Sequence, residues 1–305
     1  MAFPNAPGTV SYSGTFIPEI WSKKLIEKFY ANTVLTAISN TNYEGEIKNQ
    51  GDKVHIRTVP SLSINDYESG QTLVNQRPES STVELLIDKG KYWSAIVDDV
   101  QDVQSDIGLM NMWAQDAAEQ MKIKIDTQVL ASIKADVAAA NKGATAGALS
   151  GNIDLGATGA SLAVTKTNIL DTILYMGQVL DEQNRPESGR FLVLPYWATT
   201  LLKMSDIKDA SLTSDGSSPL RNGRVGMIDR FTIYQSNNLP HVTDTNECFD
   251  FIAGVKQGLT FASQLTKTEQ LRAESTFGNI MRGLQVYGHK VIDGESLTIA
   301  YAHKG

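Results

Sequence analysis

The sequence predicts an α+β protein, and three groups of residues carry that prediction. Lys53–Val59 and Thr82–Val97 alternate apolar and polar residues with the two-residue period of β-strands. From about Asp102 to Ala140, apolar residues recur at three- and four-residue steps, which is the period of an amphipathic helix. Short apolar runs between turn residues in the C-terminal half predict further strands.

The composition of residues 1–44 predicts an N-terminal arm. Residues 1–17 mix Gly, Pro, Ser and Thr with isolated apolar residues, which is typical of an extended segment. Pro18–Ala31 then predicts a short amphipathic helix, since its apolar residues, Trp21 and Phe29 among them, fall at helical spacing. Periodicity alone fits equally a helix packed on its own domain and an arm lying on a neighbour.

Residues 45–98 predict a long hairpin. Its strands are separated by about twenty polar and turn-rich residues between Pro60 and Ser81, and a loop of that length is usually functional. Gly90 interrupts the second strand and predicts a bulge or bend there. The loop has too little apolar surface to be stable alone, so we expect it to lie on something else.

The helix predicted after the hairpin is the strongest helical signal of the chain. Asp102 or Ser105 can cap its N-terminus, and an unbroken helix to Ala140 is about 50 Å long at 1.5 Å per residue. Residues 141–164 are rich in Gly, Ala and Ser and predict a loop or linker.

A second region of mixed structure follows. Lys166–Asp181 predicts a helix, Arg190–Leu194 a buried strand ended by Pro195, and Tyr196–Met204 a short helix before the polar loop Ser205–Val225. The further predicted elements are strands Phe231–Gln235, Phe249–Ala253, Ile280–His289 and Leu297–Tyr301, and a mixed segment Leu259–Arg272.

Composition excludes several classes of protein. The formal charge of −7 and the lack of a Lys- and Arg-rich window argue against a dedicated nucleic-acid binder. The chain lacks an apolar run long enough for a transmembrane helix, and its first residues do not read as a secretory signal. A single cysteine predicts no intrachain disulfide, so we expect folding in the cytosol.

Catalytic candidates centre on one short segment. His241, Asp244, Glu247, Cys248 and Asp250 lie close together in the sequence, and a Cys–His dyad is conceivable there. A lone cysteine is more often a small buried residue, and the histidine spacing matches no zinc pattern. We favour the structural interpretation of these residues.

A second acidic group has a simple explanation too. Asp98, Asp99, Asp102 and Asp106 lack the spacing of a calcium loop, and they suit the N-terminus of the predicted helix. Phosphate-loop, dinucleotide and nucleophile-elbow motifs are missing from the sequence. We therefore predict no catalytic, metal or cofactor site, and a protein that is not an enzyme.

The order of arm, long hairpin, long helix and α/β region resembles the major capsid proteins of tailed bacteriophages (Caudoviricetes), which have the HK97-like fold. In that fold the pieces are called the N-terminal arm, the E-loop, the spine helix of the peripheral domain, and the axial domain. Residues 91–133 look like the junction of E-loop and spine helix in the P22-type branch. The other similar segments are 189–204, 220–240 and 283–302. One departure is Asp229-Arg230 before Phe231, where the family pattern predicts a glycine.

The resemblance implies a division of the chain into four parts. They are an N-terminal arm (1–44), an extended hairpin or E-loop (45–98), a peripheral domain with the spine helix (99–160 and 273–305), and an axial domain (161–272).

The resemblance also implies a function: self-assembly into pentamers and hexamers of an icosahedral shell that encloses double-stranded DNA. The arm and hairpin are then expected to lie on adjacent subunits. The candidate intersubunit contacts are Trp21, Phe29, Asn65, Asp66, Tyr67, Glu68 and Arg77. Expected partners are further copies of the chain, a separate scaffolding protein, a portal, a decoration protein, and packaged DNA by weak non-specific contact. No membrane is expected, and the site is the virion after folding and assembly in the host cytoplasm.

Three alternatives stay open at this point. An encapsulin-like nanocompartment has the same fold and is distinguished by a bound cargo. Another phage structural protein, such as a tail or decoration protein, forms rings or trimers in place of closed shells. A Cys-dependent hydrolase using Cys248 and His241 loses activity when Cys248 is replaced by alanine.

Overall fold

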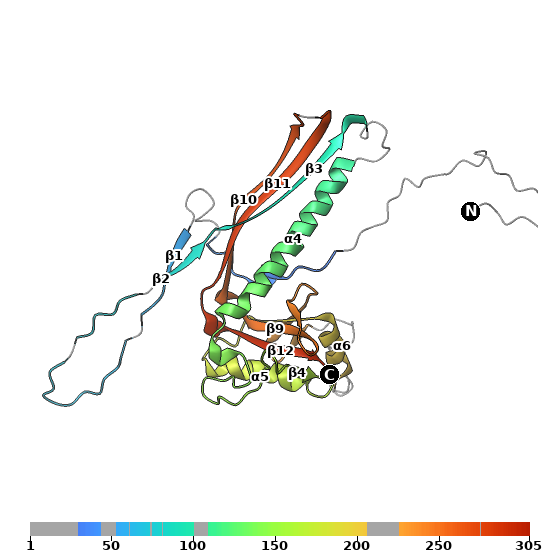
Figure 1. The fold of residues 1–305 in the computed structure, drawn as a ribbon. Coiled ribbons are helices and arrows are strands. Elements are labelled where there is room, and N and C mark those ends of the chain that lie inside the picture. Colours follow the sequence, from blue (N-terminus) through green and yellow to red (C-terminus); the bar gives the residue numbers. More distant parts are fainter. Residues whose placement is uncertain are drawn as a thin grey trace, which may run out of the picture.

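The described residues of the structure, a computed structural model, have a mixed α+β architecture with three sheets and one long helix (Figure 1). The residues that it describes are 30–43, 53–60, 62–73, 75–80, 82–100, 109–205, 226–274 and 276–305. The long helix α4 (Leu109–Asp136) lies along a three-stranded sheet, and a seven-stranded sheet lies at its C-terminal end. The predicted fold class is confirmed.

The seven-stranded sheet has the order β4-β12-β9-β5-β7-β6, and β8 pairs with β9 beside that path. Its strands are β4 (Leu162–Val164), β5 (Arg190–Leu194), β6 (Met227–Ile228), β7 (Phe231–Gln235), β8 (His241–Thr243), β9 (Glu247–Val255) and β12 (Leu297–Lys304). Helices α5 (Ile169–Glu182) and α6 (Tyr196–Met204) pack on one face. Three short turns of 3-10 helix are η1 (Ala139–Asn141), η2 (Lys256–Gly258) and η3 (Gly294–Ser296).

Strand β5 separates two hydrophobic cores. Leu192 and Leu194 belong to the core under α5 and α6, whereas Phe191 and Val193 belong to the core that contains α4. Successive side chains of a strand point to opposite faces, so this strand is buried on both sides. The prediction of a buried strand at Arg190–Leu194 is confirmed.

The three-stranded sheet is antiparallel, with β11 (Gly278–Val291) between β10 (Leu259–Arg272) and β3 (Lys89–Asp98). Helix α4 has 28 residues and is therefore about 42 Å long. One face of its C-terminal half is buried, whereas its first turns are only partly covered. The buried apolar residues of α4 are Ile125, Val129, Leu130 and Ile133. The predicted long helix is thus present from Leu109, and residues 101–108 lie outside the described residues.

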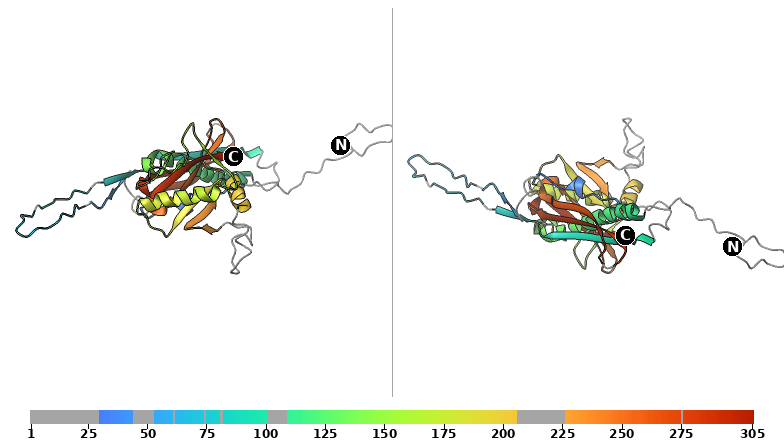
Figure 2. Two further views of the ribbon diagram at one scale, coloured as in Figure 1. Left: turned by 90° about the horizontal axis from the view of Figure 1, so that it is seen from below. Right: turned by 90° about the horizontal axis from the view of Figure 1, so that it is seen from above.

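The hairpin differs from its prediction in one respect. β1 (Lys53–Arg57) pairs with β2 (Thr82–Leu86), but the predicted strand Thr82–Val97 is broken at Ile87–Asp88. Beyond the break the chain continues as β3 in the three-stranded sheet. The interruption expected at Gly90 therefore comes a little earlier, and it is the point where the chain passes from one sheet to another. Figure 2 shows the hairpin extending away from the body of the molecule.

Two strands pair across the boundary at residues 272–273 that the resemblance implied between the axial and peripheral domains. The segment 273–305 was expected in the peripheral domain, but β12 lies between β4 and β9. Its first six residues are all buried, which requires a sheet covered on both faces. Conversely, Leu259–Arg272, expected in the axial domain, forms β10 and pairs along its length with β11, with one bulge.

The described part of the arm, residues 30–43, packs across the core around α4, and we call it the strap. Residues 30–43 include the short helix α1 (Leu35–Ile38), and Val34, Leu35 and Ile38 are buried in the core around α4. Asn40 then bridges to the start of β10. The predicted helix Pro18–Ala31 lies outside the described residues except for its last two, which are not helical.

The departure from the family pattern before Phe231 also has a structural counterpart. Ile228 pairs with Phe231, so Asp229 and Arg230 form the turn between β6 and β7. Asp229 adopts a left-handed φ of 51°, a conformation that aspartate tolerates better than most residues. Aspartate therefore occupies the place where a glycine was expected.

Candidate assembly surfaces

The tip of the hairpin is the most exposed part of the described chain. The described residues between Thr58 and Ser80 form neither helix nor strand. Side chains hold the loop together: the Gln76 side chain donates to Ser63 O at 2.7 Å and accepts from Ser63 N at 3.0 Å. Glu68 N donates to Gln71 Oε1 at 3.0 Å across a turn containing Gly70. The loop thus has internal structure without a core of its own.

The predicted contact residues of the hairpin lie together at this tip. Asn65, Asp66, Tyr67, Glu68 and Arg77 are all exposed in the single chain. Apolar side chains accompany them, with Ile64 92% exposed and Tyr67 70% exposed. The other two predicted contacts, Trp21 and Phe29, lie outside the described residues.

The three-stranded sheet has one face that α4 does not cover. Tyr287 donates a hydrogen bond to Gln128 of α4 at 3.1 Å, so the residues that share its face point toward the helix. Tyr92, Ser94 and Ile96 alternate with that set and point the other way. We call this second face the outer face; its residues are Tyr92, Ser94, Ile96, Lys267, Glu269, Leu271, Arg282 and Leu284.

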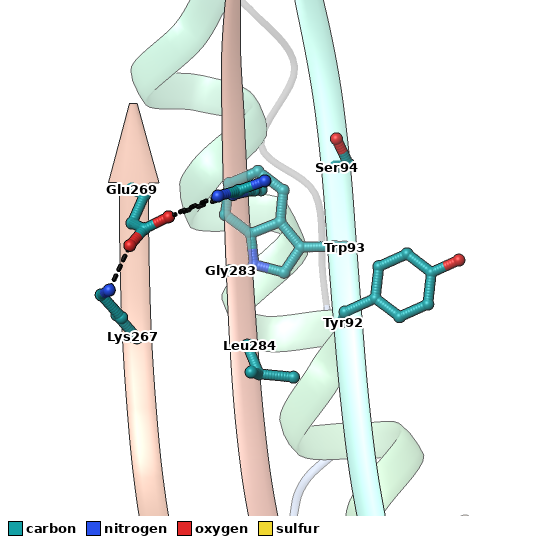
Figure 3. Close-up of a pocket in the computed structure, with 8 residues that line it drawn as sticks. Tyr92, Trp93, Ser94, Lys267, Glu269, Gly283 and Leu284 are labelled. Carbon is teal, nitrogen blue, oxygen red and sulfur yellow. Dashed lines mark hydrogen bonds and ion pairs between the residues drawn. The ribbon is translucent and has the colours of Figure 1, made fainter. Parts of the chain in front are cut away.

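The outer face carries a groove of about 620 Å³. Tyr92, which is 82% exposed, projects from the edge strand, and Leu284 lies beside it on β11 (Figure 3). The lining also includes Trp93 and Gly283, which pair with each other and share the face of Tyr287 by strand alternation; a Cβ atom on residue 283 would meet the indole. The groove is therefore lined by aromatic and aliphatic surface beside charged groups.

The groove carries more positive than negative charge. Glu269 pairs with Lys267 and accepts from Arg282 Nη2 at 2.8 Å. The hydrogen bonds from Lys267 and Arg282 hold the pKa of Glu269 below its usual value. Two cations for one carboxylate leave this patch with net positive charge. The outer face was not predicted from the sequence, although Tyr92 and Ile96 recur on one side of the β3 alternation and are a detectable signal.

The catalytic candidates are not brought together. His241 lies opposite Phe249 in the β8–β9 ladder, whereas Cys248 lies opposite Val242. Their side chains therefore point to opposite faces. Cys248 is buried, and His241 is exposed. No Cys–His dyad forms between these two residues.

The neighbouring carboxylates have structural partners. Asp250 accepts from Lys134 Nζ at 2.6 Å, and Asp244 accepts from Gly159 N at 2.6 Å. Burial raises the pKa of Asp250 although Lys134 opposes the shift. The described residues contain no group of three or more His, Cys, Asp or Glu that could hold a metal ion.

Only part of the second acidic group lies within the described residues. Asp99 is paired with Arg272, and the Arg272 guanidinium lowers the pKa of Asp99, while Asp102 and Asp106 lie outside the described residues. Among the helices that are described, none is long and apolar enough to cross a membrane.

Comparison with known proteins agrees with this geometry. The sequence profile of a family described as phage capsid protein matches residues 82–299. A structure from Mycobacterium phage Che8 is similar, with a TM-score of 0.78, 27% identity, and 95% of this chain and 98% of that chain covered. Comparison with curated proteins gives no match.

More distant structures share the fold alone. A capsid structure of Cyanophage P-SCSP1u has a TM-score of 0.71 at 16% identity, covering 95% of this chain and 94% of the other. A Cyanophage Pam1 capsid has a TM-score of 0.69 at 10% identity, covering 97% and 98%.

A long helix beside a three-stranded sheet, a second α/β unit and a projecting hairpin define a capsid subunit of the HK97-like fold. The chain belongs to the phage capsid protein family. The P22-type branch is a finer assignment than these comparisons make, and it stays a prediction.

Proposed function

We propose that this chain is the major subunit of an icosahedral phage head, in which many copies assemble as pentamers and hexamers around double-stranded DNA. The observation that carries the proposal is the family match through residues 82–299, which spans α4 and both large sheets. The resemblance in sequence and length to the structure from phage Che8 supports it. In this role the chain acts by assembly and not by catalysis.

We propose further that the hairpin tip of one copy lies on the outer face of the next copy. The tip exposes Ile64 and Tyr67, and the outer face exposes Tyr92 and Leu284, so their association removes apolar surface from water. The tip also carries Asp66 and Glu68, which complement the positive groove around Lys267 and Arg282. Electrostatic complementarity of this kind fixes register more than it adds affinity.

The N-terminal arm supplies a second proposed contact. Trp21 and Phe29 precede the strap that Asp126 and Asn238 hold to the body. Because the strap is fixed, the residues before it start from a defined point, which suits an arm that reaches a neighbour. Weak contacts of this kind, repeated around a closed lattice, give collective stability.

The remaining partners follow from the same role. A separate scaffolding protein, a portal and a decoration protein are proposed, and the acidic chain, with a formal charge of −7, suits weak contact with DNA. The proposed site is the virion, after folding and assembly in the host cytoplasm. The division into arm (1–44), hairpin (45–98), peripheral domain and axial domain is proposed as well, with β10 and β12 pairing across the boundary between the last two.

Electron microscopy tests the function. The full-length chain is expressed alone and with its neighbouring genes, and closed icosahedral particles of uniform size are expected under at least one condition. Rings or trimers point to a tail or decoration protein, and particles holding an enzyme cargo point to a nanocompartment. A persistent monomer under both conditions contradicts the proposal.

Charge-reversal substitutions on the hairpin tip and on the outer face test the proposed contact between them. We expect the double variant Asp66→Lys and Glu68→Lys to reduce particle yield. Adding Lys267→Glu and Arg282→Glu to the same chain is expected to restore the yield. Tyr92→Ser alters the outer face without touching an ion pair, and it is also expected to reduce yield. Lys256→Glu, an exposed reversal near η2, is the control. Full assembly by the Asp66–Glu68 and Tyr92 variants contradicts the contact and leaves the function intact.

A further inference from the structure

His289 lies at the point where the hairpin joins the body. It belongs to β11, two residues after Tyr287, and so it points toward α4. Lys89 is the first residue after the break between β2 and β3, and it pairs with Tyr287. The side chains of His289 and Lys89 therefore meet at the root of the hairpin, between the sheet and the helix.

The imidazole is in contact with two polar side chains. Lys89 Nζ lies 3.4 Å from Nδ1 and 3.2 Å from Nε2. Ser132 Oγ of α4 lies 2.5 Å from Nε2, and it donates its own hydrogen to Val129 O at 2.7 Å. A neutral imidazole keeps one ring nitrogen unprotonated, and Lys89 Nζ lies within hydrogen-bond distance of both nitrogens, so the ammonium can donate to the ring in either tautomer.

Burial, together with the charge of Lys89, favours the neutral form of the ring. Burial and the Lys89 charge lower the pKa of His289 to about 4, against the opposing effects of Asp88 and Asp136. Lys290 also lowers it, although Lys290 is paired with Asp136 at 3.0 Å. At neutral pH the ring is thus uncharged and offers an acceptor nitrogen to Lys89 while it contacts Ser132 of α4.

On the other face of the three-stranded sheet, apolar contacts hold the root of the hairpin. Ile56, Leu85 and Ile87 of the hairpin form a small core with Ala262 of β10. Gly288 lies against the Leu86 carbonyl so closely that a Cβ atom has no room. This anchor is apolar and steric, so protonation does not alter it. The contact between Lys89, His289 and Ser132 is a polar part of the root, and a proton on the imidazole changes it.

We propose that His289 is a positioning residue that ties the root of the hairpin to α4 only while its ring is neutral. When the neutral ring takes a proton from solvent, both ring nitrogens become donors, and the ring then faces the Lys89 ammonium with like charge. The Lys89 contact is lost while the bond to Ser132 remains. The hairpin then leaves the body with less constraint on its direction. The consequence for assembly depends on the proposed function, whereas the contact itself does not.

Mass spectrometry of the full-length chain tests the protonation state of the ring. Exchange of the imidazole Cε1 hydrogen is followed against pH, with exposed His241 as internal comparison. We expect His289 to titrate near pH 4 and, in Lys89→Met, to titrate at a higher pH because the neighbouring charge is gone. Lys91→Met removes a charge from the same face of β3 and is the matched control. Titration of wild-type His289 at the ordinary histidine value, or no change in Lys89→Met, overturns the proposal.

Backbone hydrogen exchange tests the positioning role. In the wild type, exchange of residues 82–92, measured relative to β5 in the same sample, is expected to rise roughly tenfold as the pH falls through 4, as for the loss of one hydrogen bond to a charged group. In Lys89→Met the faster exchange is expected already at pH 7 with no further step, and Lys89→Arg is expected to restore the step. A root whose relative exchange is independent of pH contradicts the role. Neither measurement requires assembled particles, so failure of the proposed function is distinguished from failure of this inference.

Discussion

Asn238 donates a hydrogen bond from Nδ2 to Oδ2 of the buried Asp126 carboxylate at 2.8 Å. The other carboxylate oxygen, Oδ1, accepts from Val34 N at 3.2 Å and from Leu35 N at 3.0 Å. One side chain of α4 thus joins the helix, the strap and the connection that follows β7. Burial raises the pKa of Asp126, while these three hydrogen bonds oppose the shift.

We expect Asp126→Ala to lower the free energy of unfolding by about 2–4 kcal/mol, since buried donors lose their acceptor. Urea unfolding at pH 7 measures the change. Glu119→Ala is the control, because Glu119 lies on the same helix in an exposed pair with Lys122, and such pairs contribute about 0–1 kcal/mol. Equal effects of the two substitutions contradict the role of Asp126.

Asp126 also has an expected pH signature. Because its pKa is raised in the folded protein, the neutral form is favoured there, and the part of the stability that depends on protonation of Asp126 is lost as the pH rises through the folded-state pKa. The Asp126→Asn variant does not titrate at this position, so the difference in unfolding free energy between wild type and variant is expected to change across this range. A constant difference contradicts the assignment.

Arg190 is fully buried and fixes the end of α5. Its guanidinium donates to Asp181 Oδ1 at 2.7 Å, to Pro186 O at 2.8 Å and to Arg185 O at 2.9 Å. We expect Arg190→Lys to lower the free energy of unfolding by about 2–4 kcal/mol, because a single ammonium does not reproduce the planar fork. Arg230→Lys, which changes the more exposed partner of the same carboxylate, is expected to cost less than about 1 kcal/mol.

The Asp181 carboxylate makes the same network sensitive to acid. Burial opposes ionisation, yet the hydrogen bonds from Arg190 and Arg230 hold the pKa of Asp181 below its usual value. Its contribution is therefore present at neutral pH and lost as the pH falls below the ordinary aspartate range. Acid titration of stability is expected to be shallower in Arg190→Lys than in the wild type.

The elements with strong periodicity were predictable from the sequence. The residues Ile169, Ile173, Met176 and Leu180 of α5 are all buried as their spacing predicts. The sheet membership of β10 and β12 was not predictable in the same way, because alternation indicates a strand without naming its partner. β12 joins the seven-stranded sheet through pairing with β9, far from it in sequence.

The assembly surfaces were predictable only in part. The polar tip between Pro60 and Ser81 indicated a projecting loop, because such a segment lacks a core. The outer face was missed, because an apolar residue such as Tyr92 in a strand is ordinarily assigned to a core. Its exposure follows from the position of α4 on the other face of the sheet, which is a tertiary property.

Glu182 is expected to hold the loop at residues 147–151 against the end of α5. Its Oε2 accepts from Leu149 N at 2.9 Å and from Ser150 N at 3.0 Å. These backbone hydrogen bonds lower its pKa to about 2, so its hold on the loop is present above pH 4.5 and is lost between there and about pH 2. We expect Glu182→Gln to raise proteolytic cleavage at residues 147–151 roughly fivefold at pH 7, as for a loss of about 1 kcal/mol. Unchanged cleavage in the variant contradicts this role, and Glu187→Gln, an exposed neighbour, is the comparison.

Gly288 and Gly90 give a matched pair of substitutions near the root of the hairpin. A Cβ atom at residue 288 would lie 2.0 Å from Leu86 O, whereas at residue 90 its nearest neighbour is Gln285 O at 4.0 Å. We expect Gly288→Ala to lower the free energy of unfolding by about 1–3 kcal/mol, the usual range for overpacking, and to increase hydrogen exchange in β1 and β2. Gly90→Ala is expected to be neutral or stabilising by about 0.5 kcal/mol, because glycine weakens a strand interior. Urea unfolding and exchange of both variants decide the matter, and the prediction fails if Gly288→Ala is as stable as Gly90→Ala.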